Sequence, residues 1–202
     1  LVSGLYAAAR LHSPSIVFID EFDALGQSRS SDTGEATRKL LSTLLTELDG
    51  LQDKKSDRLL LTLAATNRPW DLDPAVLSRF PRRIYVKLPD QEACREILMI
   101  HTKDLNCSSL DLNLLAARCV EKNYSGRDIQ NLCQQAIWHM IREENPDLYH
   151  LAELPFDDLK ERSLKIRGLE ARDFDDAFEK IRSPITADEI DRYEEWNRNF
   201  GE

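Results

Sequence analysis

Two largely apolar runs, at residues 16–19 and 59–66, are the clearest features of the hydrophobic pattern. Neither run alternates with polar residues, which is typical of strands that are buried on both faces of a parallel sheet. Between them, leucines recur at helical spacing over residues 40–48, and Gly50 is placed to end that helix. A further apolar run at 83–86 predicts a third strand. The strand–helix–strand order predicts a parallel α/β fold.

Helical spacing replaces the strand pattern after Pro89. Apolar residues three and four positions apart predict helices in the ranges 97–105, 112–120, 129–141 and 174–181, with one more at the start of the chain in 1–12. Ser125 is placed to cap the helix that contains residues 129–141. Residues 143–170 are acidic and irregular, and no element is predicted there.

The end of the chain carries a strong local signature of a helix start. Thr186 and Glu189 have the spacing of a capping box, in which each side chain bonds the backbone N–H of the other residue. The helix that follows has a largely aromatic face, made by Ile190, Tyr193, Trp196 and Phe200. Such a face is expected to be buried against another part of this chain or against a partner.

The composition fits a globular protein of ordinary size. The 202 residues are enough for one domain, or for a domain with a small appended subdomain, and a composition of 42% hydrophobic and 31% charged residues allows a core. No apolar run approaches the ~20 residues of a membrane span, and no signal peptide is recognisable. The cysteines show no C-x-x-C spacing, so free thiols in a reducing cytoplasm are expected rather than a zinc site.

The charge distribution argues against a nucleic-acid partner. The formal net charge is −9, and residues 143–202 hold 18 of the 36 acidic residues but only nine of the 27 basic ones. The acidity is therefore local, and such an excess is most often a solvated face. No basic footprint for nucleic acid is present.

Two adjacent carboxylates follow the first predicted strand, at the sheet edge where α/β proteins bind ligands. Asp20 is suited to hold Mg²⁺ through its water shell, and Glu21 is suited to polarise an attacking water, as in the Walker B pattern of nucleotide hydrolases. On the residues alone, a buried strand that leaves the sheet in an acidic turn explains the pattern equally well.

Polar residues also follow the second predicted strand. The neutral amide of Asn67 can position a water beside a γ-phosphate, or Asn67 can simply begin the turn before Pro69. The arginines that come next, Arg79, Arg82 and Arg83, form a surface patch, or one of them is an arginine finger that reaches a phosphate in a neighbouring subunit.

The combination of motifs resembles the AAA+ ATPases over nearly the whole chain. The matching segments, in chain order, are the Walker B motif (16–25), sensor 1 (64–73), the second region of homology (79–90), two lid motifs that line the nucleotide (100–103 and 124–129) and the C-terminal helix (183–201). The last segment resembles one branch in particular. That branch holds katanin, spastin, fidgetin and the vacuolar-sorting ATPase that dismantles ESCRT filaments.

The resemblance implies a fold and two cofactors. It implies a parallel αβα sandwich in residues 1–89, whose N-terminal part is missing. A small α-helical lid subdomain in 90–183 and a C-terminal helix in 184–202 would follow, and this helix would pack back on the large subdomain. ATP and Mg²⁺ would be the cofactors.

The resemblance also implies roles for single residues. Asp20 would serve Mg²⁺ through water, Glu21 would activate the attacking water, and Asn67 would be sensor 1. Arg79 would be the finger that acts on the ATP of the adjacent subunit. The residues beside the adenine and ribose would be His101, Gly126 and Arg127.

Further residues are implied at the surfaces of an assembly. Arg38, Arg79 and Arg82 would lie at subunit contacts. The second pore loop, which touches substrate, would include Arg29, Ser30, Ser31, Asp32 and Gly34. The implied assembly is a homo-oligomeric ring, a hexamer, that threads polypeptide through its pore. Its substrate would be a protein polymer, with microtubule severing and ESCRT disassembly both open.

The sequence departs from the family pattern at two places. Ser78 stands where the branch has the first of two arginines, so one finger is absent. No G-x-x-x-x-G-K-[ST] phosphate-binding loop and no first pore loop occur in these residues. We therefore expect the sequence to be the C-terminal portion of an AAA+ module.

Two other readings remain open at this point. One is a catalytically inactive AAA-like protein that binds a partner or caps a ring, as the missing phosphate loop suggests. The other is a clamp-loader or helicase-like protein that acts on DNA, against which the acidic charge argues.

Overall fold

The computed structural model describes residues 1–26, 35–51, 59–148 and 163–201. The chain divides into two compact units. Unit 1 comprises Leu1–Tyr85 together with Tyr193–Glu202, and unit 2 comprises Val86–Arg192. None of the helices in the described ranges is long and apolar enough to cross a bilayer.

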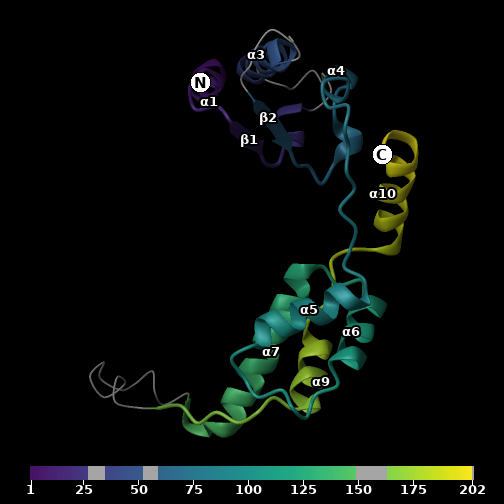
Figure 1. Cartoon of the computed structure of the whole chain (residues 1–202). Coiled ribbons are helices and arrows are strands. Elements are labelled where there is room, and N and C mark those ends of the chain that lie inside the picture. The colour runs from purple at the N-terminus through teal and green to yellow at the C-terminus, as the bar shows by residue number, and fades with distance from the viewer. Residues whose placement is uncertain (27–34, 52–58, 149–162, 202) are drawn as a thin grey trace. The chain divides into compact units, whose positions relative to one another are not determined.

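Unit 1 is built around a parallel sheet of two strands (Figure 1). Strand β1 (Ser15–Ile19) pairs with β2 (Leu60–Ala64), and Val17 lies opposite Thr62 in the register. Helix α3 (Glu35–Leu51) lies between them in the chain and supplies the crossover that parallel strands require. The predicted pair of parallel strands and the α/β class are confirmed.

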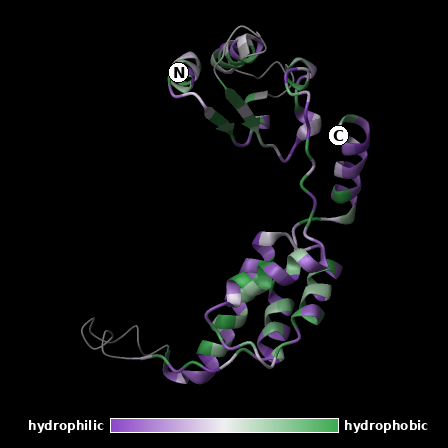
Figure 2. Ribbon diagram, viewed as in Figure 1, coloured by the Kyte–Doolittle hydropathy of each residue, from purple (hydrophilic) through white to green (hydrophobic). Residues whose placement is uncertain are grey.

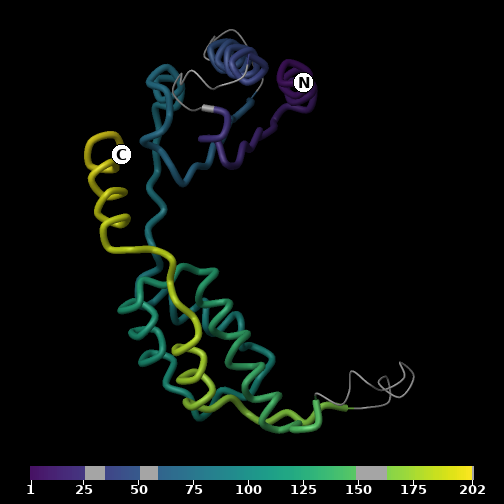
Figure 3. The backbone as a smooth tube through the Cα atoms, turned by 180° about the vertical axis from the view of Figure 1, so that it is seen from behind, coloured from purple at the N-terminus to yellow at the C-terminus, as the bar shows by residue number. Residues whose placement is uncertain are grey.

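The core of unit 1 lies on one face of this sheet. Helices α1 (Val2–Leu11) and α3 lie side by side on that face, as Figures 1 and 3 show from opposite directions. The buried side chains come from both helices, β1 and the short segments after the strands: Tyr6, Val17, Phe22, Leu44, Leu48 and Val76. The helix predicted at 1–12 is confirmed.

The prediction that both strands are buried on two faces is wrong. Every second side chain is exposed: Ile16 by 64%, Phe18 by 62%, Leu61 by 49% and Leu63 by 47%. These residues make an apolar face, and Figure 2 shows both strands as hydrophobic. The reason is that α1 and α3 both pack on the opposite face, where Val17 is buried.

Two further local predictions are also wrong. Residues 83–86 form no strand, and Ile84 and Val86 are 84% and 86% exposed. A strand exists only where its backbone bonds a neighbouring strand, and no described residue pairs with this segment. Gly50 does not end the leucine-rich helix, because α3 continues to Leu51.

Unit 2 is a bundle of helices. Its main elements are α5 (Gln91–Thr102), α6 (Leu112–Glu121), α7 (Gly126–Glu144) and α9 (Ala171–Lys180). Helix α5 packs on α6 and α7, and α7 packs on α9. The helical predictions in this region are confirmed, including the cap of α7: Ser125 and Asp128 form a complete capping box.

The four cysteines lie in unit 2 and are free thiols. Cys94, Cys119 and Cys133 are fully buried in the core, and Cys107 is half-buried. Burial in apolar surroundings disfavours the thiolate and raises the pKa of both Cys119 and Cys133 to about 12.

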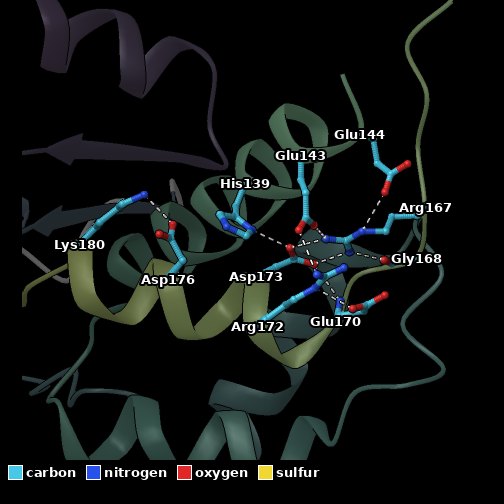
Figure 4. A network of polar contacts seen from close by, with 10 residues as sticks. All are labelled: His139, Glu143, Glu144, Arg167, Gly168, Glu170, Arg172, Asp173, Asp176 and Lys180. Carbon is cyan, nitrogen blue, oxygen red and sulfur yellow. Dashed lines mark hydrogen bonds and ion pairs between the residues drawn. The ribbon is translucent and has the colours of Figure 1, made fainter. Parts of the chain in front are cut away.

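A network of charged side chains joins α7, α9 and the segment that precedes α9 (Figure 4). The carboxylate of Asp173 is fully buried, and both terminal nitrogens of Arg167 donate to it at 2.7 and 2.8 Å. The backbone N–H of Glu170 donates to it at 2.9 Å, and His139 Nδ1 lies 2.7 Å from the same group. Burial alone would raise the pKa of Asp173, but these bonds outweigh it and lower the pKa to about 2.

The same network contains a set of groups at metal-binding spacing. The ligand atoms of His139, Glu143 and Asp173 lie within 4.8 Å of one another. The guanidinium of Arg167 already binds both carboxylates, and Arg172 adds a second contact to Glu143 at 2.9 Å. These carboxylates are therefore neutralised by arginine, and the charged cluster links α7 to α9 within unit 2.

Helix α10 (Ala187–Phe200) ends the described chain. Its predicted capping box is confirmed: Thr186 N donates to Glu189 Oε2 at 2.9 Å, and Glu189 N donates to Thr186 Oγ1 at 3.3 Å. No residue of the helix is fully buried, although Tyr193 and Trp196 are half-buried. The rings of Trp196 and Phe200 pack together with their centroids 5.5 Å apart.

Candidate functional site

The two acidic residues of the predicted site follow β1 directly. Asp20 and Glu21 are both exposed at the carboxyl end of the sheet. Backbone pairing continues past the strands, because Ala65 N donates to Ile19 O at 2.9 Å and Phe22 N donates to Ala65 O at 2.8 Å. These bonds hold the two carboxylates beside the segment that follows β2.

Glu21 has an unusual backbone conformation. Its φ of 48° lies in the left-handed region, which a residue with a side chain seldom adopts and which costs roughly 1–2 kcal/mol. Asp20 supports the turn, because its Oδ1 accepts the backbone N–H of Glu21 at 2.9 Å. The turn leaves Glu21 exposed while the next side chain, Phe22, is buried in the core. Strain of this kind concentrates at functional sites.

Asn67 lies three residues beyond β2 and is exposed. Its neighbours fix the loop, because Thr66 Oγ1 donates to Asp23 Oδ1 at 2.7 Å and accepts the backbone N–H of Arg68 at 2.9 Å. The structure thus brings Asp20, Glu21 and Asn67 to one edge of unit 1. Asp23 and Thr66 lie within the Walker B and sensor 1 segments, but nothing in the sequence indicated that their side chains bond each other.

Arg79 lies two residues beyond the short helix α4 (Pro74–Leu77), which Asp73 caps. Its guanidinium is bound within the same chain: Nε and Nη2 donate to the two oxygens of Asp49 at 3.0 and 2.9 Å. The hydrogen bonds that Arg79 donates to Asp49 raise the pKa of Arg79. Asp49 lies near the end of α3 and was not recognised in the sequence.

Ser78 takes part in holding Arg79. Its hydroxyl donates to Ala75 O at 2.8 Å and accepts from Arg79 Nη1 at 3.1 Å, while the same nitrogen also donates to Ala75 O at 3.0 Å. The residue that replaces the first arginine of the family motif therefore buttresses the second one. Arg82 is exposed on the segment that follows.

The predicted nucleotide-binding residues His101, Gly126 and Arg127 all lie in unit 2. His101 is half-buried in the last turn of α5, and the other two are exposed in the first turn of α7. A Cβ placed on Gly126 would lie 3.9 Å from Ile97 Cδ1, one turn before His101, so the two helix ends are neighbours. The structure brings these three residues to one end of the bundle.

The remaining predicted residues lie on or beside α3. Arg38 is exposed in the first turns of that helix. The predicted pore-loop residues lie outside the described part of the chain: Arg29, Ser30, Ser31, Asp32 and Gly34.

The chemistry of the edge fits a hydrated magnesium ion. Mg²⁺ prefers oxygen ligands and usually keeps several waters, and Asp20 offers an exposed carboxylate for them. The phosphate groups of a nucleotide also need backbone N–H groups and a lysine, as in a G-x-x-x-x-G-K-[ST] loop, and residues 1–202 contain no such sequence. Residues 1–202 thus contain the groups that could bind the metal and the attacking water of such a site, but not a loop that would bind the phosphates.

Comparison with known families agrees with this architecture. Residues 1–88 match the ATPase family associated with various cellular activities, abbreviated AAA, and residues 150–201 match the Vps4 C-terminal oligomerisation domain. The chain belongs to the AAA family of ATPases.

Within that family, the chain is similar to spastins over its full length. It is 39% identical to spastin of Ixodes scapularis and 36% identical to spastin of Drosophila willistoni, and it spans 30% and 25% of their lengths. The solved AAA domain of FIGL-1 matches all of this chain with a TM-score of 0.80 and 33% identity, and 62% of that structure is covered. A structure titled for katanin self-assembly matches 96% of this chain with a TM-score of 0.76 and 31% identity, again with 62% covered.

Proposed function

We propose that this chain supplies the metal, water and finger part of an ATPase that remodels protein assemblies. The observation that carries the proposal is the edge of unit 1, where Asp20, Glu21 and Asn67 follow two adjacent parallel strands. Asp20 would orient Mg²⁺ through water. Glu21 would take a proton from the attacking water, and Asn67 would hold that water or the γ-phosphate in place.

The proposed enzyme works as a ring of identical subunits, a hexamer, in the cytoplasm. The match of residues 150–201 to an oligomerisation domain supports assembly. Arg79 and Arg82 would lie at subunit contacts with Arg38, and Arg79 would stabilise charge on the ATP of the next subunit. His101, Gly126 and Arg127 would contact adenine and ribose. Free buried cysteines are consistent with a reducing compartment.

The proposed substrate is a polypeptide within a protein polymer, threaded through the pore of the ring. The similarity to spastins and to katanin supports this class. Residues 29–34 would then contact the threaded chain. Microtubule severing and ESCRT disassembly are the two candidate activities.

The test is Glu21→Gln in the complete natural polypeptide, with whatever sequence flanks residues 1–202. The amide cannot accept the proton of the attacking water, so we expect at least about a 100-fold loss of ATP turnover. Binding of ATP should persist, and ATP-dependent oligomers should last longer by light scattering. Glu121→Gln, on the exposed end of α6, is the control and should leave turnover unchanged. Normal turnover in Glu21→Gln would contradict the proposal.

A second candidate function is a catalytically inactive binding or ring-capping subunit. One observation favours it: the guanidinium of Arg79 is already bound by Asp49 of its own chain. Mixing residues 1–202 with an active spastin-type ATPase distinguishes the candidates. Stable co-assembly, with no turnover by the complete natural polypeptide alone, would support the binding subunit.

A further inference from the structure

The end of the chain contacts the loop that carries Asn67. The hydroxyl of Tyr193, in α10, donates to the backbone carbonyl oxygen of Asn67 at 2.5 Å. Both residues belong to unit 1, although 126 positions separate them in the chain. The aromatic ring of Tyr193 contacts two others, with its centroid 5.0 Å from that of Trp70 and 6.1 Å from that of Tyr85. The ring contacts hold the hydroxyl at this place.

This bond closes a set of restraints around the peptide of Asn67. On the strand side, Ala65 is paired with Ile19 and Phe22 through its backbone. Next to it, Thr66 bridges Asp23 and the N–H of Arg68. The bond from Tyr193 restrains the intervening carbonyl oxygen. The backbone that orients the Asn67 side chain is therefore restrained from β1 and from α10.

A second contact holds the far end of α10. Arg83 Nη1 donates to the carbonyl oxygen of Phe200 at 2.9 Å. The other nitrogens of Arg83 donate to Leu77 O at 2.8 Å and to Phe80 O at 3.1 Å, and these two residues flank Arg79. Rotation of the helix about its contact with Asn67 would have to break these bonds.

We propose that Tyr193 is a positioning residue for Asn67, and that it sets the direction of the Asn67 amide through the backbone carbonyl. The inference rests on the proposed function of Asn67 in ATP hydrolysis. A side chain that must hold a water or a phosphate oxygen tolerates little displacement, and a misplacement of 1 Å can cost about 100-fold in rate. In this role Tyr193 would act on the chemistry through Asn67, whose backbone carbonyl its hydroxyl contacts.

The sharpest variant is Tyr193→Phe, which keeps the ring contacts and removes only the hydroxyl. The matched control is Tyr85→Phe in the same aromatic group, because the Tyr85 hydroxyl makes no hydrogen bond with any described residue. Both variants are made in the complete natural polypeptide and again in an Asn67→Ala background. The measurements are kcat and KM for ATP, together with the thermal midpoint to verify folding.

We expect Tyr193→Phe to lower kcat about tenfold with KM nearly unchanged, and Tyr85→Phe to lower neither. In the Asn67→Ala background, Tyr193→Phe should have no further effect on kcat, because the residue through which it acts is gone. A general structural role would instead lower kcat by the same factor in both backgrounds and would lower the thermal midpoint.

Four results would overturn the inference, and they separate it from the proposed function. If Asn67→Ala lowers kcat but Tyr193→Phe does not, the inference fails and the role of Asn67 stands. Equal losses in both backgrounds, or an equal loss in Tyr85→Phe, also refute the positioning role. If Asn67→Ala leaves kcat unchanged, the role of Asn67 fails and the inference fails with it.

Discussion

At the scale of single residues, the side chain of Arg79 makes hydrogen bonds within its own chain that compete with its proposed role as an arginine finger. Its three guanidinium nitrogens donate to Asp49, Ala75 and Ser78 of its own chain. A phosphate of a neighbouring subunit can bind this group only if bonds to Asp49 are exchanged for bonds to phosphate. The Arg79–Asp49 pair therefore opposes the binding of Arg79 to that phosphate by the free energy with which the pair stabilises the free subunit.

Replacing Asp49 by Asn should ease that exchange. Exposed ion pairs are weak, so we expect ATP turnover per subunit to reach its half-maximum at about threefold lower protein concentration in Asp49→Asn. Turnover measured across a dilution series checks this. Asp104→Asn, at an exposed site in unit 2, should not shift the curve. A shift of Asp49→Asn toward higher concentration would mean that the pair prepares Arg79 for its role rather than restraining it.

The residues at this scale also show what local sequence can and cannot predict. Asp20, Glu21 and Asn67 were recognised because each follows an apolar run within a few residues, so the sheet edge places them together. Asp49 was missed because its partner Arg79 lies 30 positions away and nothing in the sequence indicates their contact. Tyr193 was predicted only as part of an aromatic face, because the acceptor of its hydroxyl is a backbone atom, which the sequence does not reveal.

At the scale of elements, the buried carboxylate of Asp173 joins α9 to α7. Its two strong donors are on Arg167, and the pair is shielded from water. Removing the buried charge of Asp173 leaves the Arg167 guanidinium paired only with the more exposed carboxylates of Glu143 and Glu144. We expect Asp173→Asn to lower the free energy of unfolding by about 3 kcal/mol, measured by urea denaturation of the chain.

The same helix offers a matched control. Asp175 in α9 pairs with Arg118 at 2.6 Å, but its side chain is 59% exposed. Asp175→Asn should therefore cost less than about 1 kcal/mol. Equal losses in the two variants would show that burial does not set the strength of the Asp173 network.

The network also predicts a dependence of stability on pH. The pKa of Asp173 is about 2 in the folded chain against an ordinary value of 3.8, so the unfolded chain binds more protons between these values. The contribution of Asp173 is complete above pH 4 and is lost as the pH falls toward 2, by about 2 kcal/mol in total. In Asp173→Asn this part of the pH profile should be absent. An unchanged acid profile would contradict the assignment.

The helices were the elements that the sequence predicted best. Periodic apolar residues and capping residues are local signals, and both the predicted cap at Ser125 and the predicted capping box at Thr186 are present in the structure. The segment 83–86 failed because a strand depends on a partner, and an apolar run does not say whether one is present. The two-sided burial of β1 and β2 failed for the same reason, since the composition of a strand does not reveal how many of its faces are covered.

At the scale of the whole molecule, the uncovered face of the sheet is the largest departure from expectation. Ile16, Phe18, Leu61 and Leu63 lie in adjacent register and are about half exposed or more. Contiguous apolar surface of this kind promotes association with other apolar surfaces. Residues 1–202 produced alone should therefore bind a hydrophobic dye and scatter more light as their concentration rises.

A double variant tests whether this face is responsible. Phe18→Thr with Leu63→Thr keeps strand-compatible side chains and removes much of the apolar surface, so dye binding and scattering should fall by about half or more. The control is Leu114→Thr with Val120→Thr, two exposed residues of α6. The control should change neither signal. A larger fall of dye binding and scattering in the control would show that the surface responsible for association lies in unit 2.

The buried thiols of unit 2 have one more consequence, for how its internal motion can be followed. Cys119 and Cys133 are inaccessible, and their raised pKa values leave almost no reactive thiolate while the bundle is closed. An alkylating reagent can modify them only during the moments when the helices separate. Their modification rates therefore report how often the bundle opens. A nucleotide that contacted both α5 and α7 would stabilise the closed bundle and lower both rates together.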